Sequence, residues 1–296
     1  MTMTTPVDKT LIISPQLKDN PFIQKFALNF THGELKTPSF PDAAFKIRKA
    51  IEQDCETEDL VKIVNMDPVI SAKLIQIVNS PFYMPMSPIS NCFEAINRLG
   101  RKTTRDLVTI FSMKNLIRSD NPAVKKLIQQ TWLQSVKISS ISFILAKLTK
   151  KTDPNEALLA GLLHNIGVLP ILSFADKQPA DSYQSSDVEL CIDEVQGQIG
   201  SIILEEWEFP ENLKKIPLLS AGWETDINEK FNLNDIIILS KYHYLLDAPG
   251  NKKLPQIDTL PSYQKLENEP LTPEMSLQIL HDARQQVADA MKFFSG

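Results

Sequence analysis

The stretch from Asp153 to Gly167, DPNEALLAGLLHNIG, constrains the fold of this chain more than any other. Asp153 followed by Pro154 predicts a helix start, because an aspartate side chain caps free backbone N–H groups and proline suits the first turn. The positions that follow are almost all apolar, and a helix that is apolar on every side belongs inside a protein. Gly167 predicts a left-handed helix stop. The sequence therefore predicts a buried central helix that ends at two polar side chains, His164 and Asn165.

The rest of the chain repeats this pattern of a capping residue followed by apolar residues at helical spacing. Such helix starts stand at Asp67, Asn91, Thr103, Asn121 and Thr272. Apolar residues recur every three or four positions after each of them, and no stretch of any length alternates as a strand does. The sequence predicts an all-α protein.

The composition is that of an ordinary globular protein, with 43% hydrophobic and 23% charged residues among 296. The formal net charge of -5 argues against nucleic acid as a partner, because phosphate binding requires a basic surface. Cys55, Cys92 and Cys191 show neither disulfide nor metal-ligand spacing, which favours a reducing compartment. Residues 1–15 do not resemble a signal peptide, and no stretch is expected to reach the roughly 18 apolar residues of a membrane span. We expect a cytoplasmic protein that binds neither nucleic acid nor membrane.

Several short motifs follow one another along the chain in a fixed order. They are Asp67-Pro68, Asn79-Ser80-Pro81, Ala95-Ile96, Leu99-Gly100, the segment GLLHNIG at 161–167 and the segment EWEFPE at 206–211. In this order they resemble the HDOD domain family, over about residues 36–250. The family is an all-α relative of the HD phosphohydrolases, and its members are mostly bacterial signalling and regulatory modules taken to lack catalysis.

The resemblance implies an N-terminal helical bundle packed on a degenerate HD-like helical half. The bundle would span about residues 36–120 and the HD-like half about 121–250. Residues 1–35 are expected to be a tail or linker with one short helix near Phe22 to Phe30. Residues 251–296 would form a loop, drawn from the proline-rich stretch 248–270, and a C-terminal helix packed on the domain.

A working HD site needs a histidine, a His-Asp pair and a later aspartate to hold a divalent cation that activates water. In this chain Gln134 stands at the place of the first histidine. His164 is retained, but Asn165 replaces the aspartate of the pair. Gln196 stands where many relatives have a further histidine, and Lys241 aligns with the final aspartate. These five residues are the vestigial HD-site positions.

A further pair of histidines, usual in the family, falls near Ser220 and Ala221. Lys241 weighs most against a metal, because an ammonium about 5 Å from a divalent ion is repelled by roughly 7 kcal/mol at an effective dielectric of 20. We therefore predict no catalytic residue, no cofactor and no metal ligand. Two interpretations of His164 and Asn165 stay open. They form a polar site for a small anion or nucleotide, with Lys241 supplying charge, or His164 bonds a backbone carbonyl in the core and Asn165 ends the helix.

The loop after the second motif is a candidate for docking a partner protein. Its residues are Asn79, Ser80, Phe82, Tyr83, Met84 and Met86. Methionine side chains adapt to varied partners, which favours docking. The alternative is a structural turn, in which Asn79 and Ser80 bond local backbone.

The leading hypothesis for function is a non-catalytic bacterial signal-transduction module that binds regulatory proteins or a second messenger. The alternative is a divergent metal-dependent phosphohydrolase acting on a phosphoester or cyclic dinucleotide.

Overall fold

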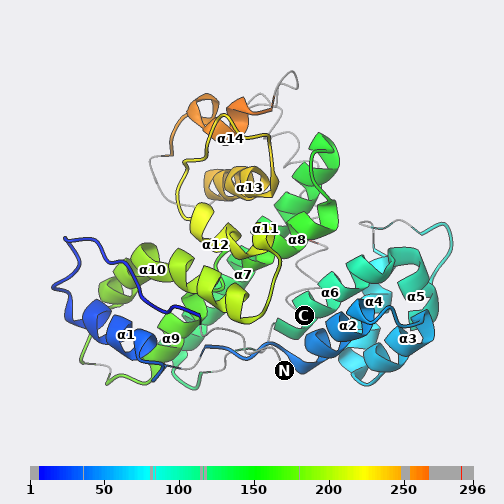
Figure 1. Ribbon diagram of the computed structural model, residues 1–296, viewed down its shortest axis with the longest axis horizontal. Coiled ribbons are helices and arrows are strands. Elements are labelled where there is room, and N and C mark those ends of the chain that lie inside the picture. Colours follow the sequence, from blue (N-terminus) through cyan, green and yellow to red (C-terminus); the bar gives the residue numbers. More distant parts are fainter. Residues whose placement is uncertain are drawn as a thin grey trace.

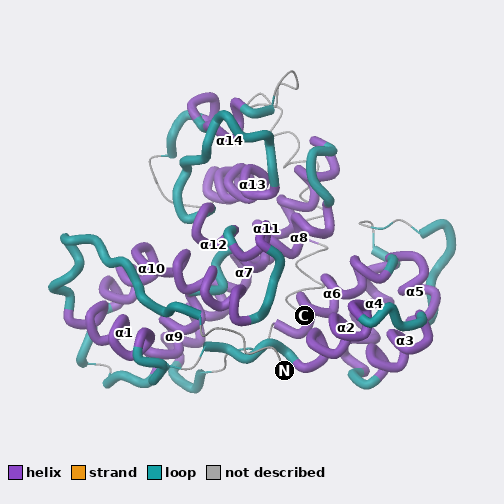
Figure 2. Tube along the Cα trace, viewed as in Figure 1, coloured by secondary structure: helices purple, strands orange, loops and turns teal. Residues whose placement is uncertain are grey.

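The computed structural model describes residues 7–35, 37–80, 83, 85–113, 116, 119–179, 181–247, 254–266 and 288. Every regular element in these ranges is a helix, so the predicted all-α class is confirmed (Figures 1 and 2). The helix that we predict from Thr272 lies outside the described residues.

The elements follow one another along the chain as fourteen α-helices and one 3-10 helix in the described ranges. They are α1 Pro21–Thr31, α2 Asp42–Glu52, α3 Thr57–Asn65, α4 Pro68–Val78, α5 Cys92–Leu99, α6 Arg101–Met113, α7 Pro122–Thr149, α8 Pro154–Leu163, α9 Val168–Asp176, α10 Ser185–Glu206, α11 Glu211–Lys214, α12 Ile216–Leu219, α13 Leu233–Asp247, η1 Ile257–Thr259 and α14 Pro261–Gln264.

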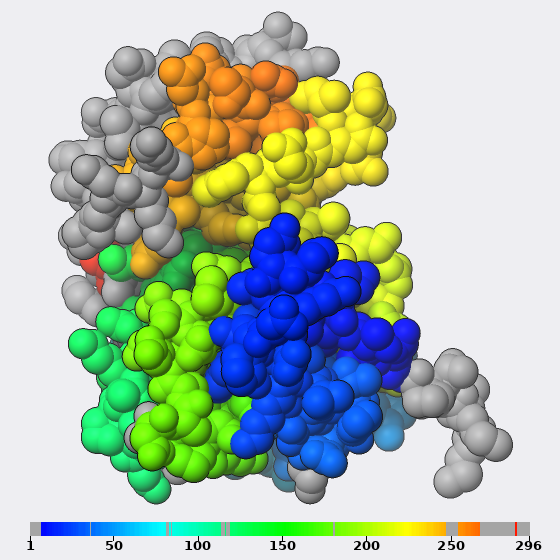
Figure 3. Space-filling model, turned by 90° about the vertical axis from the view of Figure 1, so that its left-hand side faces the viewer, coloured from blue at the N-terminus to red at the C-terminus, as the bar shows by residue number. Residues whose placement is uncertain are grey.

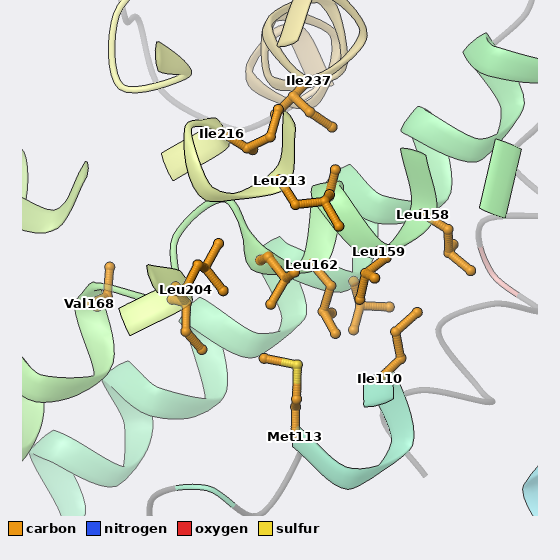
Figure 4. Packing of buried hydrophobic residues seen from close by; sticks show 14 of the residues in the cluster. Ile110, Met113, Leu158, Leu159, Leu162, Val168, Leu204, Leu213, Ile216 and Ile237 are labelled. Atoms are coloured by element: carbon orange, nitrogen blue, oxygen red, sulfur yellow. The ribbon is translucent and has the colours of Figure 1, made fainter. Parts of the chain in front are cut away.

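Helices α2 to α6 form a bundle on one side of the molecule, and α7 to α13 form the second half (Figure 1). The predicted central helix is α8, which contacts α6, α7, α12 and α13. Its leucines Leu158, Leu159 and Leu162 lie near Ile110 and Met113 of α6 (Figure 4). The oxygen of the Asp153 side chain accepts from the N–H groups of the first turn at 2.9 Å, as predicted. Helix α8 therefore connects the two halves through a common core.

The expected N-terminal tail is folded onto the second half. The predicted short helix is α1, which packs on α10, and its Phe22 and Phe26 rings lie 5.4 and 5.5 Å from the ring of Phe174. Upstream of α1, Ile12 exchanges two backbone hydrogen bonds of 2.8 Å with the side chain of Gln198 on α10. Figure 3 shows this N-terminal segment lying across the second half. A tail or linker is therefore the wrong description for residues 21–31.

Small residues allow the long helix α7 to cross α8 closely. A Cβ atom on Gly161 would lie 2.5 Å from Cα of Ser139, and the Ser139 hydroxyl donates to the carbonyl of Leu158 at 2.5 Å. One turn along α7, the Ser142 hydroxyl, whose oxygen would lie 2.9 Å from the same Cβ atom, donates to the hydroxyl of Ser240 on α13 at 3.0 Å. Helix α7 is thereby fixed between α8 and α13, the helices that border the site described below.

Gly167 does not adopt the predicted left-handed conformation, because its φ is -66° and its ψ is -12°. The glycine is required for a different reason. A Cβ atom at this position would lie 1.9 Å from the carbonyl oxygen of Gln196. The missing side chain thus lets the end of α8 approach α10.

A buried ion pair holds the segment after α13. The Asp235 carboxylate accepts from Lys265 Nζ at 3.2 and 3.3 Å, from the Ser262 hydroxyl at 2.9 Å and from the Thr225 hydroxyl at 3.1 Å. Asp235 and Ser262 are fully buried, and Lys265 is 8% exposed. Residues 254–266 contain η1 and α14, so the loop that we predict over 248–270 is partly helical where the structure describes it. The helical turns bring the buried partners of Asp235 to one side of the segment.

One stretch of the described chain, Pro154–Asp176, is long and apolar enough to cross a membrane by length and composition, with a mean hydropathy of 1.8. The expectation that no stretch is apolar enough for a membrane span is therefore wrong by length and composition. In the structure 89% of the most apolar 18-residue window of this stretch is buried inside the protein, within α8, α9 and the turn between them. Its apolar character is that of a core segment.

Candidate functional site

All five vestigial HD-site positions border one cavity of about 320 Å³. The side chains come from four places in the second half: Gln134 from α7, His164 and Asn165 from the turn after α8, Gln196 from α10, and Lys241 from α13. Ser220 and Ala221 border the same cavity, where the resemblance places the further histidines. The fold thus brings together residues that are more than 100 positions apart in the sequence.

Two acidic residues at the cavity were missed in the sequence analysis. Glu189 and Asp193 are exposed, whereas His164 and Asn165 are 6% and 7% exposed. The carboxylates therefore lie at the opening and the imidazole and carboxamide on the floor. Glu189, Asp193 and Gln196 follow a spacing of four and three residues, which places them on one face of α10. That spacing was the available signal.

His164 is neutral and holds a defined tautomer. Its Nδ1 donates to the carbonyl oxygen of Gly161 at 2.7 Å, since a carbonyl only accepts. Nε2 therefore has a lone pair and is an acceptor. Burial, and to a smaller extent the positive charge of Lys241, together lower the pKa of His164 to about 3, against the opposing effect of the Gly161 carbonyl. The hydrogen bond expected of a core histidine is present, and the same ring borders the cavity.

Asn165 lies in the turn after α8, and the Ser135 hydroxyl of α7 donates to its Oδ1 at 2.7 Å. The Ser135 hydroxyl also lies 2.8 Å from the Thr131 carbonyl oxygen, and its one proton is donated to only one of the two acceptors. When Asn165 Oδ1 accepts it, the amide nitrogen of Asn165 remains as a donor beside the cavity. Asn165 also borders a smaller apolar cavity of about 40 Å³ that includes Trp132 and Leu162. A neutral carboxamide thus stands where an HD enzyme has an anionic oxygen.

Lys241 is held in place by backbone and aromatic groups. Its ammonium donates to the carbonyl oxygens of Ser220 and, at 3.3 Å, of Ala221, and lies 5.3 Å from the centre of the Trp223 ring. These contacts fix a positive charge beside the floor of the cavity. The same charge contributes to the lowered pKa of His164.

The side chains at this cavity do not fit a divalent cation. Among the residues described, no group of three or more His, Cys, Asp or Glu side chains is arranged to hold one. His164 is the nitrogen donor on the floor, and it faces a lysine ammonium in place of carboxylates. Amide oxygens and one imidazole do not offset that repulsion.

The predicted docking loop makes several hydrogen bonds within the chain where the structure describes it. The Asn79 amide bonds the backbone of Ile75 and Ile89 at 2.7 to 2.9 Å, and the buried Ser80 hydroxyl donates to Ile77 at 2.6 Å. The Tyr83 hydroxyl donates to the side chain of Asn155 at 2.7 Å. Met86 is fully exposed. Phe82 and Met84 lie outside the described residues. The predicted turn contacts of Asn79 and Ser80 are therefore present.

Known proteins are similar to this chain in sequence and in fold. An uncharacterised protein of Treponema pallidum strain Nichols is 23% identical over 189 residues, which are 59% of this chain and 35% of that protein. The chain thus spans about a third of that relative's length.

Two solved structures align over most of the chain. A protein of Shewanella amazonensis SB2B, provisionally named a metal-dependent phosphohydrolase, has a TM-score of 0.77 and 22% identity, covering 90% of this chain and 97% of that chain. A protein of Marinobacter aquaeolei VT8, provisionally named a signal transduction protein, has a TM-score of 0.60 and 18% identity, covering 98% of this chain and 68% of that chain. At these identities the likeness concerns the fold.

The sequence model of the HDOD domain matches residues 37–218, which is more than half of the chain. The match contains the end of α8, where His164 and Asn165 lie, and the face of α10 that borders the cavity. This chain belongs to the HDOD domain family.

Proposed function

We propose that this chain is a non-catalytic regulatory module, which passes on a signal by binding a partner protein and a small molecule. The observation that supports this proposal most is the cavity at the vestigial HD-site positions, where amides and an ammonium stand in place of metal ligands. A site of this kind retains the means to bind and lacks the means to activate water.

The acid–base properties of the floor support the same proposal. A general base works best when its pKa lies near the working pH. The pKa of His164 is about 3, so the ring is a poor base near neutral pH. Lys241 adds a positive charge where hydrolysis through a metal would require negative ligands.

The names of the two similar structures favour different functions. The name of the Marinobacter protein favours signal transduction, and that of the Shewanella protein favours the alternative, a metal-dependent phosphohydrolase. The amide-and-ammonium composition of the cavity decides our preference for the first.

The test of catalysis is metal content and phosphodiesterase activity of the purified chain. We expect no stoichiometric iron, manganese or nickel, and no turnover of a generic phosphodiester or a cyclic dinucleotide. A matched positive control is the triple variant Gln134→His, Asn165→Asp and Lys241→Asp, which restores donors at three positions and should gain metal. Stoichiometric metal in the natural chain, with turnover that is lost in His164→Ala, would establish the phosphohydrolase instead.

Partner binding is tested by affinity capture from the native cell extract followed by mass spectrometry. The bait is the whole chain, compared with Met86→Ser in the exposed part of the docking loop. Met66→Ser is the control, because Met66 is also exposed but lies at the end of α3. We expect a regulatory protein that the natural chain and Met66→Ser retain and Met86→Ser loses. Equal capture by all three would exclude this loop as the docking surface.

A further inference from the structure

We propose that the cavity binds a small zwitterion, a molecule with a carboxylate and an ammonium group a few atoms apart, as in an α-amino acid. This inference rests on the proposed function, because it treats the bound molecule as a signal and not as a substrate. The cavity of about 320 Å³ falls at the lower end of the size range of small-molecule sites, about 300–1,000 Å³.

The floor of the cavity is suited to the carboxylate. Lys241 supplies the positive charge, and its position is fixed by the carbonyl groups of Ser220 and Ala221. The amide nitrogen of Asn165 is a neighbouring donor, since the amide oxygen already accepts from Ser135. Charge-assisted hydrogen bonds of this kind are stronger than neutral ones. A carboxylate on the floor would therefore gain both an ion pair and an amide contact.

The opening of the cavity is suited to the ammonium. Glu189 and Asp193 lie one turn apart on α10 and are exposed at this opening. Their negative charges attract a cationic group and repel a molecule with several phosphates. The cavity offers nucleotides and cyclic dinucleotides one lysine to neutralise their phosphates and two carboxylates that repel them at the entrance. Their negative charge therefore disfavours binding.

The His164 ring adds a requirement for an N–H donor. Its Nδ1 is used by the Gly161 carbonyl, and within the described part of the chain no hydrogen bond reaches Nε2. The ring is buried, so an acceptor there gains most from a donor supplied by the ligand. The ammonium must therefore reach from the Glu189 and Asp193 carboxylates to this ring, so that one of its N–H groups donates to Nε2. A trimethylated betaine of the same charge has no such N–H group.

The charge pattern also explains why a single charged ligand group is insufficient. A simple amine meets Lys241 on the floor, and a simple carboxylic acid meets Glu189 and Asp193 at the entrance. Each lacks one of the two attractive contacts and retains the repulsive one. A zwitterion makes a favourable charge contact with Lys241 and with the Glu189 and Asp193 carboxylates at once.

The test is calorimetric titration and thermal melting of the whole chain with each of the common L-amino acids. For every amino acid that binds, the matched amine, carboxylic acid and betaine are titrated in parallel. We expect at least one amino acid to bind saturably. Each of its three analogues should bind at least about tenfold more weakly, a loss of binding free energy of about 1.4 kcal/mol or more.

The variants are Lys241→Met and the pair Glu189→Gln with Asp193→Asn, which remove the charges at the two ends of the cavity. Each should weaken binding by about tenfold or more. Lys230→Met and Glu34→Gln remove the same charges from exposed positions elsewhere and should not weaken it. Circular dichroism of every variant shows whether it is folded.

The outcomes separate this inference from the function on which it rests. Binding of nucleotides alone, binding of no amino acid, or binding that is equal in the natural chain and both cavity variants would overturn the zwitterion site. None of these results is evidence for catalysis, so the proposed regulatory function would stand. Metal-dependent turnover would instead overturn the proposed function itself.

Discussion

At the scale of single residues, Asp106 is a second place where this chain buries a charge. Its Oδ1 accepts from Arg105 Nε at 2.9 Å and Nη2 at 2.7 Å, while its Oδ2, within the described residues, has no hydrogen-bond partner. Burial raises the pKa of Asp106 to about 6, and the Arg105 charge opposes the rise only in part. The folded protein therefore holds this proton more tightly than the unfolded chain, whose aspartates have a pKa near 3.8.

The substitution Asp106→Asn should change how stability depends on pH. Between about pH 4 and pH 6 the natural folded state binds more protons than the unfolded state, so the contribution of Asp106 falls as pH rises through this window. Asparagine resembles the protonated form at every pH. Relative to the natural chain, the variant should therefore gain on the order of 2 kcal/mol between about pH 4 and pH 7.5.

Urea unfolding of the natural chain and of Asp106→Asn at about pH 4 and pH 7.5 gives this change in relative stability. The effects of other titrating groups cancel between the two proteins. Asp59→Asn serves as control, because Asp59 is exposed and its pairing with Lys62 is a surface contact. A stability difference that is the same at both pH values would contradict the buried charge.

His164 leads to a second prediction at this scale. With a pKa of about 3, its ring should not titrate between about pH 5 and pH 8, as followed by NMR of the ring protons. Stability from this neutral ring is fully present above the unfolded pKa near 6.5 and is lost as pH falls toward 3. Lys241→Met should raise the pKa of His164, and Lys230→Met should not. An imidazole that titrates near neutral pH would contradict the buried position.

The sequence predicted individual residues of the site better than their surroundings. The order of motifs identified Gln134, His164, Asn165, Gln196 and Lys241, and all five border one cavity. The Ser135 partner of Asn165 and the acidic residues of the opening depend on how α7 and α10 are rotated about their axes, which no motif records.

The helix start that we predict at Thr103 lies inside α6, and Asp106 in the next turn is buried. Helix α6 begins at Arg101, directly after Gly100, whose φ of 78° ends α5. The tertiary contact that buries the carboxylate has no local pattern in the sequence.

At the scale of elements, the helices themselves were largely predictable and their crossings were not. Capping residues and apolar periods predicted starts at Asp67, Asn91, Asn121 and Asp153, and each caps a helix in the structure. The contact of α7 with α8 depends on Gly161 lying against Ser139, which requires knowing which faces meet.

The substitution Gly161→Ala tests that crossing. In an isolated helix alanine is more favourable than glycine by about 1 kcal/mol. Here the new Cβ atom would lie 2.5 Å from a backbone atom of Ser139, and overpacking of this kind costs about 1–3 kcal/mol. The variant should therefore be less stable in urea unfolding. Gly222→Ala is the control, because its Cβ would meet only the Glu224 nitrogen at 3.9 Å. A stabilised Gly161→Ala would contradict the close crossing.

At the scale of the whole molecule, the two halves meet at a second place besides α8. The Trp207 indole after α10 donates to the Pro38 carbonyl at 3.0 Å, and the Phe40 ring lies 5.2 Å from Trp207 and 5.7 Å from Phe209. Arg48 of α2 stacks 4.7 Å from the Phe40 ring and donates to the Trp207 carbonyl. The EWEFPE segment that identified the family is thus an attachment between the halves.

Arg48→Met should loosen this attachment while retaining much of the side-chain volume. Loss of a charge-assisted hydrogen bond and a ring contact should lower the free energy of unfolding by about 1.5–3 kcal/mol. Hydrogen exchange should increase over residues 37–48 and 207–209. Arg101→Met removes an exposed ion pair with Asp54 and should cost less than about 1 kcal/mol. Equal effects of the two substitutions would contradict a specific role for Arg48.

The Asp235–Lys265 pair has a practical consequence for anyone who shortens this chain. The recognised family segment stops at residue 218, yet α13, with Lys241, comes after it, and its Asp235 needs an ammonium from residue 265. A fragment trimmed to the recognised segment would lack one side of the cavity. A fragment that ends after α13 would retain that side but leave an acid group in the interior without its cation, at a cost of about 3–5 kcal/mol. Fragments made for crystallisation or ligand screening should therefore extend at least through residue 266.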